Sequence, residues 1–171
     1  MGSSDEALAE ALTQVDICFI VTPGPTEKRG ELALNAARAC KIAGVAFTVV
    51  VSVATADKED TIFGKQFGPM ENDFNKLEID GCILRLPMFM ENAMGNIPTI
   101  TKDGKIYAPI PIDKKYSTIS LNDIAECYIH IAKTYLKHKK QTYSLYSDTY
   151  TNQDVLDGFR KATGRDYIQY V

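Results

Sequence analysis

The sequence predicts an α/β fold built on a parallel sheet, and three observations support this prediction. Helical patterns and apolar strand patterns alternate along the chain, which is typical of a parallel sheet flanked by helices. Val45–Val53 reads VAFTVVVSV, an apolar run of the kind that is buried on both faces of such a sheet. The 171 residues contain no internal repeat and suffice for one domain with one core, so we expect a single compact unit.

The first third of the chain predicts two helices and two strands. The segment DEALAEALTQ follows Ser4 and is acidic at its start, which predicts a helix capped by Ser4. Asp16–Thr22 (DICFIVT) predicts a short strand that ends at the turn residues PGP. Within Thr26–Gly44, alanine, leucine and cysteine recur on one helical stripe, and Gly44 predicts the end of that helix. The strand over Val45–Val53 follows.

The remaining elements follow from the same patterns. In chain order, the sequence predicts a helix over Gly68–Lys76, a strand over Cys82–Pro87, a short helix or ordered loop over Met88–Pro98, a strand broken by prolines over Lys105–Asp113, a helix over Leu121–Leu136, a strand over Thr142–Ser147, a helix over Thr151–Gly164 and a strand over Asp166–Val171. The strands therefore keep alternating with helices to the end of the chain.

Composition argues against several classes of function. A net charge of −3 disfavours non-specific binding to nucleic acid, which needs a basic surface. The N-terminal segment is polar and acidic, unlike a signal peptide, and the longest apolar stretch, Ala43–Ala56, is too short to span a bilayer. Four dispersed cysteines predict free thiols in a reducing compartment, so we expect a cytoplasmic protein. The two histidines lack the spacing of a metal site.

Four stretches of the chain, in order, resemble the NmrA-like family of atypical short-chain dehydrogenases. They are ICFIVTPG (17–24), SVATADKEDTIFGKQFGPMENDF (52–74), CILRLPMFMEN (82–92) and ISLNDIAE (119–126). The resemblance runs over nearly the whole chain and implies a Rossmann core that binds NAD or NADP as its dinucleotide partner.

The resemblance also exposes an absence. Family members begin with a strand, a G-x-x-G-x-x-G turn and a helix, where the glycines let the backbone approach the cofactor's pyrophosphate. This sequence contains no such turn. We therefore expect a partial Rossmann-like parallel sheet flanked by helices, without the first βαβαβ half, and weak or lost cofactor binding. The residues that would distinguish NAD from NADP lie in the part that is not present.

The acid–base pair of the wider superfamily is missing as well. Many short-chain dehydrogenases use Tyr-x-x-x-Lys to move a proton during hydride transfer. Against that pattern, Phe63 takes the tyrosine position and Phe67 the lysine position, while Lys65 is out of phase on a helix. The sequence predicts no catalytic residue and favours a non-catalytic redox-sensing or regulatory module. Two alternatives are an oxidoreductase of the quinone or isoflavone reductase type in a longer chain, and a fragment without activity.

The resemblance implies two groups of site residues. The cofactor-binding residues are Thr22, Pro23, Gly24, Ser52, Phe67 and Pro87. The substrate-pocket residues are Phe63, Met88, Phe89 and Asn92. Three of these groups have a plainer interpretation. Phe63 and Phe67 would pack a helix start against the sheet, Thr22–Gly24 would form an ordinary turn after the first strand, and the Met- and Phe-rich segment would be core.

The strand over Asp16–Thr22 has a further consequence. In the family's sheet this strand is interior, and its partner on one side belongs to the absent half. We expect it to form an open edge of a sheet of four to five parallel strands. An apolar strand with an unpaired edge is prone to self-association, so a homo-oligomer through this edge is a further prediction.

Overall fold

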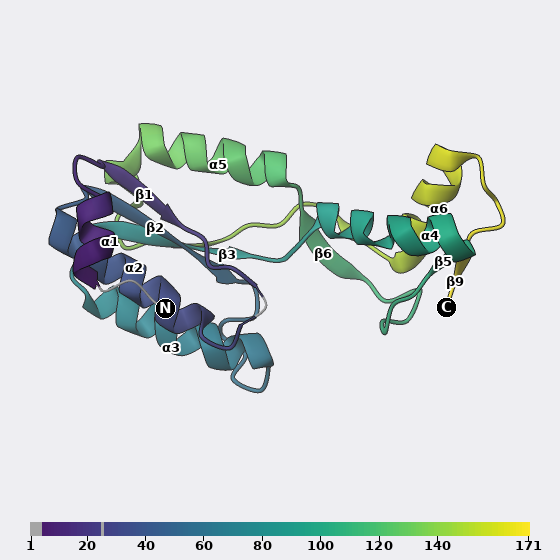
Figure 1. Cartoon of the computed structure of the whole chain (residues 1–171), viewed down its shortest axis with the longest axis horizontal. Helices are drawn as coiled ribbons and strands as arrows, with labels where there is room; N and C mark the ends of the chain where they lie inside the picture. The colour runs from purple at the N-terminus through teal and green to yellow at the C-terminus, as the bar shows by residue number, and fades with distance from the viewer. Residues whose placement is uncertain (1–4, 25) are drawn as a thin grey trace. The chain divides into compact units, whose positions relative to one another are not determined.

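The computed structural model describes residues 5–24 and 26–171, and they form two compact units (Figure 1). The first unit comprises the described residues up to Leu86 together with Glu126–Leu145. The second comprises Pro87–Ala125 and Tyr146–Val171. The chain thus differs from the single unit expected, because two segments of its second half fold on each other around a small core of their own.

A four-stranded parallel sheet forms the centre of the first unit. Its strands lie in the order β1 (Ile17–Ile20), β2 (Phe47–Val53), β3 (Gly81–Leu86) and β7 (Thr142–Ser144). The apolar run that predicted β2 occupies an interior position, as expected for a strand covered on both faces. In the described chain no strand pairs with the outer side of β1, which confirms the predicted open edge and the predicted sheet size.

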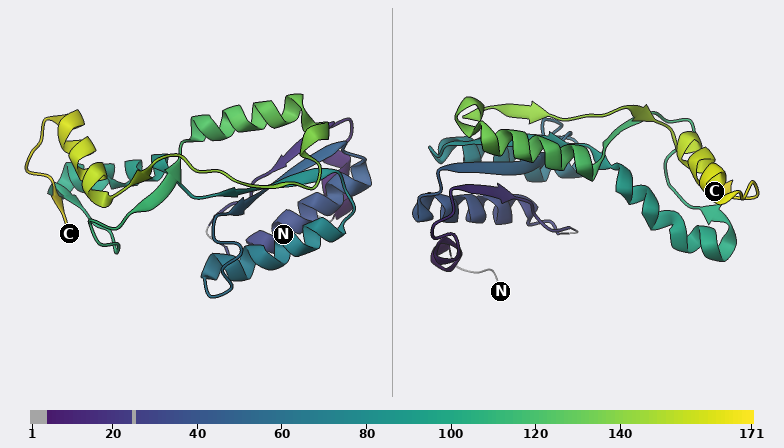
Figure 2. Two further views of the ribbon diagram at one scale, coloured as in Figure 1. Left: turned by 180° about the vertical axis from the view of Figure 1, so that it is seen from behind. Right: turned by 90° about the horizontal axis from the view of Figure 1, so that it is seen from above.

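Helices cover both faces of this sheet (Figures 1 and 2). α2 (Arg29–Ala43) and α3 (Ile62–Lys76) lie on one face, and the short α1 (Asp5–Ala11) packs beside α2. The part of α5 (Leu121–Lys133) that belongs to this unit, from Glu126 onward, covers the other face together with η2 (Tyr135–His138). Aromatic contacts hold this second layer, since Phe19 of β1 stacks on Tyr128 of α5 with ring centroids 4.5 Å apart.

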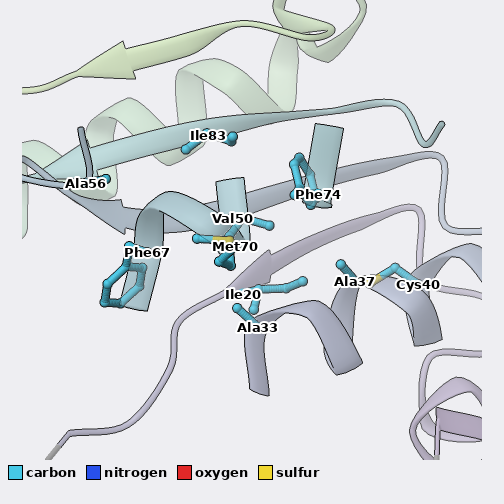
Figure 3. Close-up of a cluster of buried hydrophobic side chains, with 10 residues drawn as sticks. All are labelled: Ile20, Ala33, Ala37, Cys40, Val50, Ala56, Phe67, Met70, Phe74 and Ile83. Atoms are coloured by element: carbon cyan, nitrogen blue, oxygen red, sulfur yellow. The ribbon is translucent and has the colours of Figure 1, made fainter. Parts of the chain in front are cut away.

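The main core lies between the sheet and the α2–α3 layer (Figure 3). It is formed by Ile20, Ala33, Ala37, Cys40, Val50, Ala56, Phe67, Met70, Phe74 and Ile83. Small residues on α2 let the two helices approach closely. At Gly30 the approach is so tight that a Cβ would lie 2.4 Å from the main-chain oxygen of Gln66.

The helix boundaries test the sequence patterns locally. α2 ends at Gly44, which adopts φ 72° in the left-handed region as predicted. The prediction that the next helix begins at Gly68 is wrong, because α3 begins six residues earlier, at Ile62. Thr61 caps it: its Oγ1 accepts a hydrogen bond from the Gly64 amide at 2.8 Å. The proposed cap of α1, Ser4, lies outside the described residues.

The second unit consists of short elements. They are β4 (Met88–Phe89), η1 (Met90–Asn96), α4 (Ile97–Asp103), β5 (Lys105–Ile106), β6 (Tyr116–Ile119), β8 (Thr149–Tyr150), α6 (Asn152–Thr163) and β9 (Gln169–Tyr170). β6 pairs with β4 in parallel and with β8 in antiparallel fashion, and β5 pairs with β9. α6 is confirmed, with a Thr151 capping box and Gly164 at its end. The strand expected over Lys105–Asp113 ends at Ile106, shortly before the prolines.

Three further observations concern the cysteines, membrane-spanning helices and metal sites. All four cysteines are free thiols, with Cys40 and Cys82 buried and the other two half-buried. Across residues 5–24 and 26–171, no helix combines the length and apolar character needed to cross a membrane. Within the same residues, no three His, Cys, Asp or Glu side chains are grouped closely enough to hold a metal ion.

Candidate functional site

Arg29, the first residue of α2, has its side chain near both the loop at the carboxyl end of β1 and the start of α3. Thr22, Pro23 and Gly24 follow the strand, and a Cβ added to Gly24 would lie 3.8 Å from Arg29 Nη2. On its other side the guanidinium lies over two rings, 5.4 Å from the centroid of Phe67 and 5.7 Å from that of Phe63. Arg29 therefore lies close to Gly24 and to both α3 phenylalanines, Phe63 and Phe67.

The charge of Arg29 is not balanced by a carboxylate in the described chain. No ion pair forms with it there, and its Nε is buried without a hydrogen-bond partner among the described residues. A guanidinium at the carboxyl ends of parallel strands suits an anionic ligand, because its planar donors match phosphate and carboxylate oxygens. Sequence reasoning missed Arg29. The available signal was a cation in the first turn of a helix, where the helix dipole disfavours it.

The two phenylalanines differ sharply in environment. Phe67 is 2% exposed and belongs to the main core, whereas Phe63 is 47% exposed at the start of α3. Neither ring can transfer a proton, and α3 presents Lys65 to a different cavity. The packing interpretation accounts for the burial of Phe67, and contact of either ring with a cofactor or substrate stays a prediction.

Ser52 lies at the end of β2 and takes part in a buried polar cluster with Glu71 and Arg85. The Ser52 hydroxyl donates to Glu71 Oε1 at 2.5 Å. Arg85 binds the same carboxylate in bidentate fashion, with Nε 2.9 Å from Oε1 and Nη2 2.6 Å from Oε2. Ser52 is 1% exposed and Glu71 6% exposed. The hydroxyl is therefore engaged by a structural carboxylate, and its predicted contact with a cofactor stays a prediction.

A polar cavity of about 520 Å³ opens beside this cluster. It is lined by Ala56, Asp57, Glu59, Gly64, Lys65, Gly68, Pro69, Glu71, Asn72 and Arg85. Both charge signs are present, with three carboxylates and two cations. The wall therefore has no strong preference for one sign of ligand charge, unlike the cluster around Arg29.

The second unit contains an apolar cavity of about 490 Å³, and three of the predicted substrate-pocket residues line it. These are Met88, Phe89 and Asn92, which lie on β4 and η1. The rest of the lining is Met90, Ala93, Ala108, Ile110, Tyr116, Thr118, Tyr150, Asn152, Asp154, Val155, Gly158, Phe159 and Ala162. Pro87 precedes β4 and does not line the cavity, and Phe63 belongs to the first unit.

One side of the apolar cavity carries a chain of hydrogen bonds. The Tyr116 hydroxyl donates to Asn152 Oδ1 at 2.9 Å, and Asn152 Nδ2 donates to the Tyr170 hydroxyl at 3.0 Å. The Tyr170 hydroxyl donates in turn to the main-chain oxygen of Ile110. Burial raises the pKa of Tyr116 above its usual range, and the nearby Tyr170 and Asp154 add to the effect. Tyr116 therefore stays neutral at physiological pH.

The predicted site residues thus divide between the two units. The first unit brings Gly24, Phe63 and Phe67 together around Arg29, while Thr22 and Pro23 precede Gly24 in the same loop and Ser52 belongs to a separate polar cluster with Glu71. The second unit brings together Met88, Phe89 and Asn92.

Several solved structures that share the fold are described as reductases or epimerases. A nucleoside-diphosphate-sugar epimerase from Staphylococcus aureus superposes with a TM-score of 0.81 at 23% identity, covering 98% of this chain and 60% of its own. An NADPH-dependent quinone oxidoreductase from Escherichia coli, complexed with NADPH, gives 0.81 at 21%, covering 98% and 58%. Triphenylmethane reductase from Citrobacter sp., complexed with NADP(H), gives 0.79 at 19%, covering 99% and 61%.

These likenesses confirm the Rossmann-like α/β fold. The chain spans about 60% of the length of these three solved structures. A search of curated proteins finds no match to this sequence. The NmrA-like family model matches residues 3–170, nearly the whole chain, and this chain therefore belongs to the NmrA-like family.

Proposed function

We propose that this chain is a dinucleotide-binding module of the NmrA-like family that responds to NAD or NADP without catalysing hydride transfer. One observation carries the non-catalytic part of the proposal: the positions of the tyrosine and lysine are occupied by Phe63 and Phe67. Neither side chain can donate or accept a proton, and the nearby Ser52 hydroxyl is engaged by Glu71. Two of the structural neighbours are complexes with NADPH or NADP(H), which supports the choice of ligand.

Arg29 supplies the positive charge for the cofactor in this proposal. Its guanidinium lies between the loop after β1 and the α3 phenylalanines, at the edge of the sheet where open α/β folds bind ligands. The chain holds no glycine-rich turn to cradle a pyrophosphate, so this chain alone binds weakly. We expect a dissociation constant on the order of 0.1 mM or weaker, equivalent to about −5.5 kcal/mol.

A fluorescence titration with NADPH tests this proposal, using the wild type, Arg29→Gln and the matched control Lys28→Gln. Lys28 is the adjacent, exposed cation just before α2. We expect Arg29→Gln to weaken binding by about tenfold, because it removes a charge-assisted contact, and Lys28→Gln to change it by less than about twofold. Low-micromolar binding by the wild type would contradict the weak-binding proposal. Equal effects of the two substitutions would remove Arg29 from the site.

The second candidate function is an NAD(P)H-dependent oxidoreductase of the quinone or isoflavone reductase type. The apolar cavity lined by Met88 and Phe89 favours it, since such a cavity suits an apolar substrate. The discriminating assay follows NADPH oxidation by this chain with a quinone as acceptor. The non-catalytic proposal predicts no oxidation above the rate without protein, and protein-dependent oxidation would favour the reductase.

Two further parts of the proposal concern the setting of the protein. The four free thiols fit a reducing compartment, so we propose the cytoplasm as its location. The unpaired outer side of β1 (Ile17–Ile20) fits association of two copies through their sheet edges.

A further inference from the structure

The apolar cavity of the second unit contains one polar group whose hydrogen bonding is incomplete. Thr118 lies on β6, is 5% exposed and lines the cavity. Its Oγ1 is buried and has no hydrogen-bond partner among the described residues. By contrast, the Tyr116 and Asn152 side chains in the same wall form a hydrogen bond with each other. A hydrogen bond from a ligand would therefore stabilise Thr118 more than either of these two side chains.

The backbone at Thr118 is held in place while its side chain can turn. The main-chain oxygen of Thr118 accepts hydrogen bonds from the amide and the hydroxyl of Ser147, at 2.9 and 2.8 Å. β6 also pairs with strands on both sides. Rotation about χ1 moves Oγ1 and Cγ2 together among the three staggered positions on Cβ, so another rotamer brings Oγ1 to the position that Cγ2 holds in the first. The wall can therefore present either a methyl group or a hydroxyl to the cavity without moving the strand.

Charge in the wall restricts the ligand further. Asp154 is the only charged side chain among the described residues that line the cavity. Its carboxylate accepts hydrogen bonds from the Thr151 amide and hydroxyl, at 2.8 and 2.6 Å. These bonds lower its pKa, so it stays ionised at neutral pH. With a fixed negative charge and no cation in the lining, the cavity disfavours an anion.

We propose that this cavity binds a neutral, mainly apolar small molecule with one hydrogen-bonding group, and that Thr118 Oγ1 recognises that group. The volume of about 490 Å³ lies in the range of small-molecule sites. Most of the lining residues are apolar, among them Met88, Phe89 and Phe159. The proposal deepens the substrate site of the second candidate function, and it requires neither dinucleotide nor turnover.

Three probes with one ring system separate the parts of this proposal: 2-naphthol, naphthalene and 2-naphthoate. They share the apolar rings and differ in a hydroxyl, no polar group or a carboxylate. The chain contains no tryptophan, so naphthyl fluorescence can be followed with little background from the protein. The titrations use the full chain without dinucleotide. We expect 2-naphthol to bind about fivefold more tightly than naphthalene, and 2-naphthoate to bind more weakly than both.

Substitutions at Thr118 test the recognition step. Thr118→Val has nearly the same shape without the hydroxyl. We expect this variant to bind 2-naphthol and naphthalene about equally tightly, with its affinity for naphthalene unchanged. Thr118→Ser keeps the hydroxyl and should keep most of the preference. If Thr118→Val retains the preference for 2-naphthol, Thr118 does not recognise the ligand and the proposal is overturned.

A second pair of variants tests whether the probes occupy this cavity. Gly158 lies on α6 and lines the cavity, and a Cβ there meets nothing within 4 Å. Gly158→Leu should fill part of the cavity and abolish probe binding without lowering the melting temperature, because leucine also favours the helix. Gly95→Leu is the control, since Gly95 is equally open but does not line the cavity.

The outcomes distinguish this proposal from the function proposed above. Loss of probe binding in Gly158→Leu, but not in Gly95→Leu, supports the cavity whatever the NADPH titrations give. No binding of any probe at millimolar concentration, unchanged binding in Gly158→Leu, or 2-naphthoate binding as tightly as 2-naphthol would each overturn it. Failure of NADPH to bind overturns only the dinucleotide proposal.

Discussion

Replacing Glu71 with leucine removes the acceptor at the centre of the buried polar cluster. The Glu71 carboxylate holds the Ser52 hydroxyl and both donating edges of the Arg85 guanidinium, with contacts between 2.5 and 2.9 Å to its nearest donors. Glu71→Leu keeps a side chain of similar size against the sheet. It leaves the Arg85 cation, whose side chain is 24% exposed, without its carboxylate.

The magnitude follows from the burial of the two partners. Breaking a buried ion pair from one side costs about 3–5 kcal/mol, because the remaining charge stays poorly solvated. Arg85 retains some access to water, so we expect the lower end of this range, about 3 kcal/mol. That loss is a large part of the 5–15 kcal/mol that typically stabilises a domain. Ser52→Ala removes only the hydroxyl bond and should cost about 1.5 kcal/mol.

Equilibrium unfolding in urea measures these differences. With a slope of about 2 kcal/mol per molar urea, Glu71→Leu should lower the midpoint by roughly 1.5 M. The double variant Glu71→Leu with Arg85→Leu should be less destabilised than the sum of its single variants, since it removes both members of the buried ion pair. Additive effects, or a loss below about 1 kcal/mol for Glu71→Leu, would show that the pair is not buried and coupled as described.

Three other predictions concern packing, pH and assembly. Gly30→Ala should lower the free energy of unfolding by about 1–3 kcal/mol, because its Cβ would lie 2.4 Å from the Gln66 oxygen. Gly158→Ala in α6 is the control and should raise the free energy of unfolding by up to about 1 kcal/mol. Equal melting temperatures of the two variants would contradict this prediction. Burial raises the pKa of Cys82 from 9.0 to about 12, with a smaller contribution from a nearby thiol. The folded chain then binds this proton more tightly than the unfolded chain, so stability is full below pH 9 and should fall by about 2 kcal/mol by pH 10.5, a loss that Cys82→Val should reduce. Self-association through β1 (Ile17–Ile20) predicts a molar mass near twice that of one chain in light scattering, and a folded, strictly monomeric protein would contradict it.

Elements with strong local patterns were predictable from the sequence. β2 follows from its unbroken apolar run, and α6 follows from a Thr151 cap and a terminal Gly164. The start of α3 was missed because Gly64 and Gly68 resemble loop residues. Gly64 is instead required by packing inside the helix, since a Cβ there would lie 1.8 Å from the Lys58 oxygen. Such a close approach depends on how the chain folds back and leaves no local pattern.

β6 and the second unit likewise depend on contacts that local sequence patterns do not reveal. The four residues of β6 are too few for a clear alternation, and the strand is defined by partners from β4 and β8. The division into two units depends on contacts between segments that are distant in sequence. Local patterns therefore could not reveal it.

The sequence predicted which segments contribute to the candidate sites, but it did not predict which polar side chains lie in them. The resemblance to the family pointed to the loop after β1 and to Met88, Phe89 and Asn92, which the structure places in one cavity wall. The sequence patterns did not single out Arg29 and Thr118, because the roles that we propose for them depend on three-dimensional neighbours. Arg29 contacts rings on another helix, and the buried Thr118 hydroxyl has no hydrogen-bond partner within residues 5–24 and 26–171.

The most direct test of the central claim is a crystal structure of this chain soaked with NADP⁺ at millimolar concentration. We expect the dinucleotide at the carboxyl ends of β1 and β2, with a phosphate oxygen within hydrogen-bond distance of the Arg29 guanidinium and the loop Thr22–Gly24 beside it. A dinucleotide bound in the cavity of the second unit, or one ordered away from Arg29, would contradict the proposed binding site.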